Sequence, residues 1–79
     1  MHMSPTVFES KRLKFKVHFK DHNPPHVHVE GPGAEAVFDL DGCHCIQNSG
    51  FSEKAIRQIE KQIIEKKQLF LEAWNEYQK

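Results

Sequence analysis

In the run Asp21-His22-Asn23-Pro24-Pro25-His26-Val27-His28-Val29, one strand must end and another must begin. The two prolines exclude a helix, because proline lacks a backbone N–H and restricts the residue before it. The alternating His-Val-His-Val that follows predicts a histidine-rich strand over residues 26–30. Side chains alternate along a strand, so both histidines should lie on one face and both valines on the other.

The segments on either side of this run extend the pattern. Upstream, residues 12–20 alternate apolar and mostly basic side chains and predict a strand with an apolar face and a basic face. Downstream, Gly31-Pro32-Gly33 predicts a tight turn, because glycine tolerates positive φ and proline restricts its own. A third strand is predicted over residues 34–40 and a short fourth strand over 43–47.

The last third of the chain predicts one long helix over about residues 52–77. Ser52 suits the N-cap position. One helical stripe carries the apolar residues Ile56, Ile59, Ile63, Phe70, Trp74 and Tyr77. Such a helix would be about 40 Å long at 1.5 Å per residue, longer than a domain of this size is wide. We therefore expect it to bend near Lys66-Lys67, or to pack its end on a partner.

These elements predict a single α+β domain over residues 1–79. Its fold would be an antiparallel β-meander of three to four strands packed on one long, bent or partner-bound, C-terminal helix. The apolar helical stripe is the cover that the chain offers for the apolar strand faces. The opposite face of the sheet would then be exposed or covered by a second copy. The core that a chain of 79 residues can form is only marginally stabilising, which favours a homo-oligomer or a partner chain.

Composition restricts the classes of function. The formal net charge is zero, from 11 Lys and Arg against 11 Asp and Glu, so overall charge indicates neither nucleic-acid nor membrane attraction. No stretch has the length of a membrane span, and the first twenty residues lack the apolar core of a signal peptide. Cys43 and Cys45 are too close along one strand for ordinary disulfide geometry. We therefore expect reduced thiols, a cytoplasmic location and no membrane partner.

The string Pro24-Pro25-His26-Val27-His28-Val29 and the closing Ala73-Trp74-Asn75-Glu76 resemble the short prokaryotic domain-of-unknown-function family numbered 4160. The resemblance runs from about Pro5 to Tyr77. It implies a bacterial, cytoplasmic and partner-dependent protein. Members of that family are often encoded beside a second small protein, of the family numbered 2442, and such pairs have been proposed as toxin–antitoxin modules.

The leading hypothesis is therefore the toxin half of a bacterial toxin–antitoxin-type two-protein module, acting through a small cognate protein partner. The toxin half is preferred because the sequence predicts no DNA-reading helix. Trp74 and Tyr77, at the far end of the predicted helix, are the candidate partner-binding residues, because Trp and Tyr are enriched at interface hot spots. The competing interpretation is that both aromatic side chains complete the core.

A small metal-independent ribonuclease is the second hypothesis. Such an enzyme needs a general base, a general acid and cations that stabilise the charged transition state. The candidate acid and base are the histidines that the family resemblance carries over, His26, His28 and His22. The candidate phosphate-binding residues are Arg12, Lys14 and Lys16, which would equally serve nucleic-acid binding without cleavage. Glu35 or Asp39 could orient an imidazole.

Two further interpretations concern the same face of the sheet. Lys14 and Lys16 could simply pair with Glu35 and Asp39 across the strands. A metal-binding accessory module is the third hypothesis, because His26 and His28 could converge on one ion, with His18 across the hairpin. Structural zinc requires four ligands, and nothing in the sequence places the two cysteines near these histidines. We therefore predict no resident metal and no cofactor.

Overall fold

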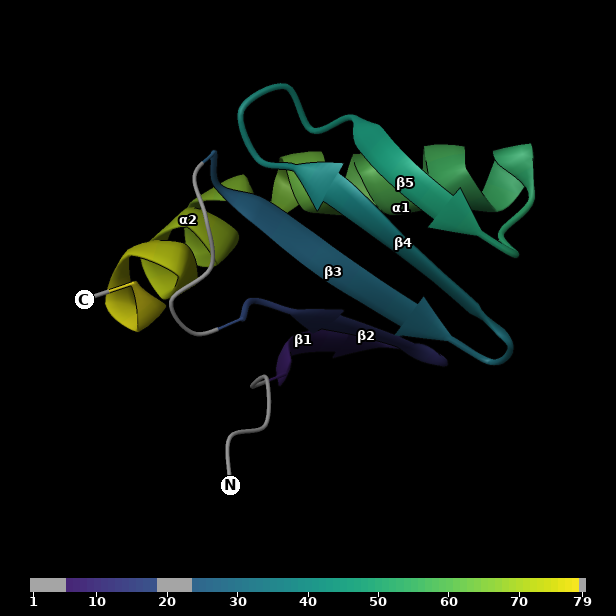
Figure 1. Cartoon of the computed structure of the whole chain (residues 1–79), viewed down its shortest axis with the longest axis horizontal. Helices are drawn as coiled ribbons and strands as arrows, with labels where there is room; N and C mark the ends of the chain where they lie inside the picture. The colour runs from purple at the N-terminus through teal and green to yellow at the C-terminus, as the bar shows by residue number, and fades with distance from the viewer. Residues whose placement is uncertain (1–5, 19–23, 79) are drawn as a thin grey trace.

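The computed structural model describes residues 6–18 and 24–78, which form one antiparallel sheet and two helices. The strands are β1 (Thr6–Ser10), β2 (Leu13–Lys16), β3 (His26–Gly31), β4 (Ala34–Asp39) and β5 (Cys45–Ser49). The helices are α1 (Glu53–Glu65) and α2 (Lys67–Tyr77). The strands lie side by side in chain order, and both helices lie behind the sheet in Figure 1, with α1 behind β4 and β5 and α2 near the start of β3.

The α+β class and the antiparallel meander are confirmed, but the predicted three to four strands are five. The additional strand, β1, pairs with β2 through a two-residue turn, Lys11-Arg12. Lys11 adopts a φ of 56°, which this kind of turn requires but which asparagine or glycine normally signals. The turn therefore has no recognisable sequence signal, and the prediction missed β1.

The strand boundaries differ most for β2 and β5, whereas β3 and β4 each end one residue away from the predicted 26–30 and 34–40. β2 ends at Lys16, and the rest of the predicted strand 12–20 includes Phe19 and Lys20, which lie outside the described residues. β5 is Cys45–Ser49 rather than 43–47, so it begins and ends two residues later than predicted. The loop before it is held by the Gly42 N–H, which donates to Asp39 Oδ1 over 2.6 Å, and by a φ of 60° at Cys43.

The apolar faces of the strands pack against the helices, as predicted. Phe15 pairs with Val29, and Val29 pairs with Ala36, which places all three on the helix-facing side of the sheet. Among the described residues, the core consists of twelve buried side chains: Phe15, Val17, Val27, Val29, Ala36, Phe38, Leu40, Cys43, Ile59, Ile63, Phe70 and Trp74.

The predicted single helix is two helices, because it breaks at Lys66, which is where a bend was one of the two expectations. Lys66 has φ −110° and ψ 18°, and its N–H still bonds to the carbonyl of Gln62. The break redirects α2 toward β1 and β2, where Phe70 stacks on Phe15 at 5.6 Å and meets Phe8 edge-on at 6.4 Å. The start of α1 is as predicted, since Ser52 Oγ accepts a hydrogen bond from the Ala55 N–H over 3.1 Å.

Within residues 6–18 and 24–78, neither helix has the length and apolar character needed to cross a membrane.

Candidate functional site

The face of the sheet opposite the helices presents polar side chains in rows across the strands. The register pairs Lys16 with His28, His28 with Val37, and Val37 with Gln47. These positions alternate with the buried ones, so their side chains point away from α1 and α2. Apart from the contact of Trp74 in α2 with the His26 ring at one end, no helix in the described part of the chain covers this face, which we call the open face.

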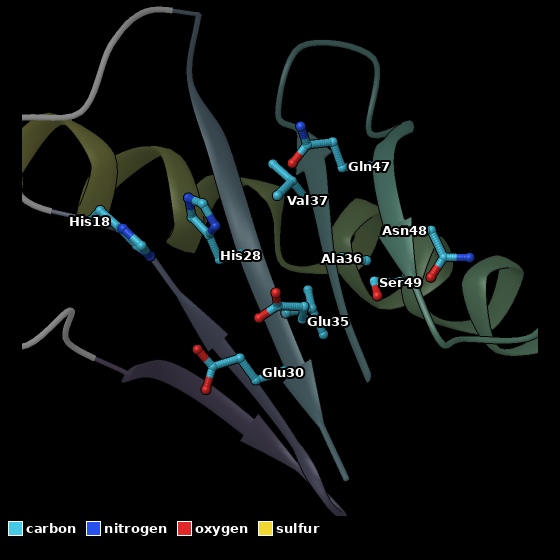
Figure 2. A pocket seen from close by; sticks show the side chains of 10 residues that line it. His18, His28, Glu30, Glu35, Ala36, Val37, Gln47, Asn48 and Ser49 are labelled. Carbon is cyan, nitrogen blue, oxygen red and sulfur yellow. The ribbon is translucent and has the colours of Figure 1, made fainter. Parts of the chain in front are cut away.

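A hollow of about 720 Å³ lies on the open face. In Figure 2 the imidazoles of His18 and His28 lie on one side, and β5 forms the other side with Gln47, Asn48 and Ser49. The remaining polar side chains in the lining are Glu30 and Glu35. The volume falls within the range of small-ligand and side-chain binding sites, and the lining combines carboxylate, amide, hydroxyl and imidazole groups.

Three histidine rings meet at one side of this hollow. His18 stacks on His28, with ring centroids 3.7 Å apart and an interplanar angle of 22°. His26 meets His28 edge-on at 5.1 Å, and the His26 ring also lies 5.0 Å from that of Trp74. The structure therefore brings His26, His28 and His18 together, as the strand pattern predicts. His22, the remaining catalytic candidate, lies outside the described residues.

The orientation of His26 follows from its backbone contact. Its Nδ1 lies 2.9 Å from the carbonyl oxygen of Pro24. A carbonyl only accepts, so Nδ1 carries the proton in this hydrogen bond. The Pro-Pro sequence thus has two roles: it ends the preceding strand, and it supplies the carbonyl acceptor that orients His26, the first histidine of β3.

The charged residues pair differently from the prediction. Lys16 Nζ lies 3.1 Å from Glu30 Oε1. Pairing of Lys14 and Lys16 with residues of β4 is wrong for a topological reason: β3 lies between β2 and β4, so both lysines have cross-strand partners on β3 instead. Asp39 faces His26 in the register and accepts from the Gly42 N–H.

The candidate phosphate-binding residues separate along β2. Lys16 lies directly beside His28 in the register, and Lys14 lies opposite Glu30. Arg12 is in the turn between β1 and β2, four residues before Lys16 and six before His18. At about 3.3 Å per residue, its backbone lies about 13 Å along the strand from the level of His28, which is beside Lys16, and about 20 Å from that of His18. The structure thus brings Lys16 to the histidine cluster but does not bring Arg12 there.

Neither cysteine belongs to the hollow. Cys43 is buried, and Cys45 is half-buried, with its N–H donating to Glu60 Oε2 over 3.2 Å. Burial raises the pKa of both thiols, although nearby Lys67 opposes this for Cys43. Such thiols are weak nucleophiles. Among residues 6–18 and 24–78, no three His, Cys, Asp or Glu side chains are arranged to hold a metal ion, so the metal-binding hypothesis gains no support there.

The candidate partner-binding aromatics lie mainly inside the fold. Trp74 is 3% exposed and belongs to the core, and Tyr77 is half-buried against it. Partner contact by either residue stays a prediction. In the part of the chain that the structure describes, the large apolar side chains that are exposed are Ile46, Ile64 and Leu69. None of the three is among the predicted site residues, although Ile64 and Leu69 fall outside the apolar stripe of the predicted helix, which is the signal that could have identified them.

Comparison with known proteins gives the family. The model of the family described as Domain of unknown function (DUF4160) matches residues 12–75. The chain belongs to this family. The match to DUF4160 includes β2 through β5, and therefore every strand that lines the hollow. No curated protein and no solved structure matches the chain.

Proposed function

We propose that this chain is the toxin half of a bacterial toxin–antitoxin-type module and binds a small cognate protein at the hollow on its open face. The observation that carries the proposal is the hollow itself. A solvated antiparallel sheet face needs no cover and no recess. Here a recess of about 720 Å³ gathers polar groups from β3, β4 and β5.

The groups in the hollow favour a partner that presents hydrogen-bond donors. Glu35 is exposed and lies directly opposite Glu30 in the register, and Lys16 pairs with Glu30. Like charges opposite one another destabilise a sheet unless a cation joins them. A lysine or arginine side chain of the partner would supply a further cation, and the amide of Gln47 and the hydroxyl of Ser49 would orient it. Charge complementarity of this kind sets specificity more than affinity.

The toxin half rather than the antitoxin half is favoured by the placement of the helices. Both described helices use their apolar sides to cover the sheet, through Ile59 and Ile63 in α1 and Phe70 and Trp74 in α2. A DNA-reading motif needs a helix that projects into the major groove. α1 and α2 instead serve as the second layer of the domain.

Growth and complex formation in a bacterial host test this proposal. The chain is induced alone, and then together with the small protein encoded beside its gene. We expect growth arrest in the first case, relief in the second, and a complex that survives purification. The double variant Glu35→Gln/Gln47→Ala, at two exposed positions of the hollow, should lose the complex. Gln58→Ala, at an exposed position of α1, is the matched control and should keep it.

The outcome decides the proposal in either direction. A wild-type chain that neither arrests growth nor binds the neighbouring protein overturns it. So does a complex that the double variant retains. Circular dichroism of each variant establishes that the fold is intact before binding is compared.

A metal-independent ribonuclease is a second candidate, favoured by the contact between the three histidine rings beside Lys16. In such an enzyme one neutral imidazole removes the proton of the 2′-hydroxyl and a protonated imidazole donates to the leaving oxygen. The amine of Lys16 would stabilise the charge on the phosphate. The family resemblance supports the same histidines, since two of them lie in its Pro-Pro-His-Val-His-Val string.

Cleavage of a labelled RNA by the purified chain tests this candidate. His26→Ala and His28→Ala should each abolish cleavage, whereas His44→Ala, at an exposed histidine outside the cluster, should not. Cleavage that is unchanged in the first two variants would come from a contaminant or another site and would exclude this mechanism.

A further inference from the structure

The outer edge of β5 differs from an ordinary sheet edge. β5 is the last strand of the sheet, and no other strand pairs with its outer side in the described residues. Edge strands expose N–H and C=O groups that attract other strands, and proteins usually protect them with charged residues, proline or β-bulges. β5 has a register shift against β4 at Ile46, between Cys45 and Gln47, but it lacks the other two protections. Residues 42–52 contain no Asp, Glu, Lys, Arg or Pro. The opposite edge strand, β1, carries Glu9 and leads into Lys11-Arg12.

One hydrogen bond shows which part of α1 lies at this edge. The His44 carbonyl accepts from the Asp39 N–H over 2.9 Å, so it points toward β4. Because the peptide bond is trans and planar, the N–H of Cys45 must point the opposite way, away from β4 and past the outer edge of β5. Its acceptor is Glu60 Oε2, so the Glu60 side chain of α1 reaches the outer side of β5.

An apolar surface lies on the same flank. Ile64 follows Glu60 by one helical turn and therefore lies on the same side of α1. Ile64 is 60% exposed, and Ile46 of β5 is 56% exposed. Two of the three large apolar side chains that are exposed in the described chain thus belong to the β5 flank, which we define as β5 with Glu60 and Ile64.

We propose that the β5 flank pairs with the β5 flank of a second copy of this chain, with the two β5 strands antiparallel. A two-fold axis perpendicular to the sheet produces this arrangement and keeps both helical layers on one side. Under two-fold symmetry each β5 strand pairs with the same sequence in the other copy. A charged residue near the axis would therefore lie close to the same charged residue of the second copy and repel it. The uncharged segment 42–52 avoids this repulsion near the axis. Glu60 lies beside Cys45 at the first residue of β5, so the two Glu60 carboxylates would lie at opposite ends of the paired strands. Ile46 and Ile64 supply apolar contact.

The dimensions predict a reversible dimer. Five residues of β5 span about 17 Å at about 3.4 Å per residue, and the 13 residues of α1 span about 20 Å. The molecule is 20 Å thick along its shortest axis, which gives a flank of roughly 400 Å² per copy. A total near 800 Å² is below that of permanent dimers, so association should depend on protein concentration.

Pairing would also extend the candidate site. Gln47, Asn48 and Ser49 of β5 form one side of the hollow, on the open face. A second copy added at this edge continues that face and places the two hollows next to each other, with β5 strands of both copies between them. The proposed pairing rests on the residues of the β5 flank and does not depend on the proposed function.

The test is the molar mass of the purified chain, measured by sedimentation over a hundredfold range of concentration. The wild type should rise from one chain toward two. Ile46→Lys, which places a charge at the edge, should remain at one chain over the whole range, and Ile64→Lys should shift the rise to higher concentration. Thr6→Lys, at an exposed position of the other edge strand, is the matched control and should behave as the wild type.

Amide hydrogen exchange of the wild type locates the contact independently of any variant. Amides of β5 should become more protected as the concentration rises, whereas those of β1 should not change. A wild type that stays at one chain throughout overturns the proposal. Association that survives Ile46→Lys and Ile64→Lys, or that protects β1 in place of β5, also overturns it.

Discussion

Adding a single methyl group at Gly50, as in Gly50→Ala, should strongly lower the free energy of unfolding. Gly50 adopts a φ of 102°, and it follows β5 directly, where the chain passes the turn between β3 and β4. A Cβ at this position would lie 2.7 Å from the Gly33 carbonyl oxygen and 3.0 Å from the Ala34 Cβ. Ordinary C···O contacts are about 3.3 Å or longer, so Gly50→Ala must move the end of β5 away from that turn.

The expected cost has two parts. A φ of 102° lies outside the region that an L-residue tolerates, which costs about 1–2 kcal/mol for alanine. Moving the strand end disrupts one or two hydrogen bonds near the Glu35–Ser49 pair, at about 1 kcal/mol each. The sum is about 3 kcal/mol, a large part of the roughly 4–12 kcal/mol that a chain of 79 residues has in total.

Gly33→Ala is the matched control. Gly33 also has positive φ, at 67°, but a Cβ there would have no heavy atom within 4 Å. Its alanine variant should lose only about 1 kcal/mol, for the backbone conformation alone. In urea unfolding, with a slope of about 1 kcal/mol/M, the midpoints of the two variants should differ by about 2 M. Equal midpoints would show that the close approach of Gly50 to Gly33 does not limit stability, and would refute this reasoning.

Three further perturbations follow from other local features. Ser52→Ala removes the acceptor of the Ala55 N–H and should cost about 1 kcal/mol in the same unfolding assay. Lys11→Gly relieves a φ of 56° and should raise the free energy of unfolding by about 0.5 kcal/mol. Burial raises the pKa of Cys43 and Cys45, so the folded chain holds thiol protons that the unfolded chain releases. Their contribution to the free energy of unfolding is complete below the ordinary thiol pKa and is lost as the pH rises through the raised pKa. Because the folded chain keeps these thiols protonated, iodoacetamide at pH 8 should alkylate them more slowly in the folded chain than in urea.

The parts of the fold that could be predicted are those that a local pattern determines. The alternation in residues 26–30 and 34–40 requires two-faced strands, and the register confirms their faces through the pairing of Val29 with Ala36. The N-cap at Ser52 is equally local. β1 could not be predicted because its turn uses Lys11 at positive φ, a conformation that tertiary pairing imposes against the preference of lysine.

The helix break shows a different limit. The length of the helical pattern indicates that a straight helix cannot fit, and Lys66-Lys67 marks where the apolar stripe is interrupted. The direction of α2 after the break depends on Phe8, which belongs to the strand that the pattern missed. Phe8 packs on Phe70, and Lys66 Nζ lies 5.0 Å from the Phe8 ring. A contact between residues about sixty positions apart is a property of the packed structure.

The candidate site divides in the same way. Strand alternation is enough to place His26 and His28 on one face with Lys16. The ion pairs could not be predicted from alternation alone, because they depend on the order of the strands in the sheet. β3 separates β2 from β4, so Lys16 pairs with Glu30 of β3 and not with a residue of β4. The hollow is less predictable still, since β5 completes it and β5 begins two residues later than the pattern indicates.

β5 is the element on which both proposed surfaces depend, and the chain attaches it to the rest of the fold by a few specific contacts. Every residue from Ile46 to Ser49 is exposed, so apolar packing contributes little to holding it. Beyond its pairing with β4, it is held by the Cys45–Glu60 hydrogen bond at one end. At the other end, the Asn48 side chain accepts from the Phe51 N–H and donates to the Phe51 carbonyl. A strand held by polar contacts at its ends keeps its open-face side chains and its outer edge in solvent, which is the arrangement that a binding wall and a pairing edge both require.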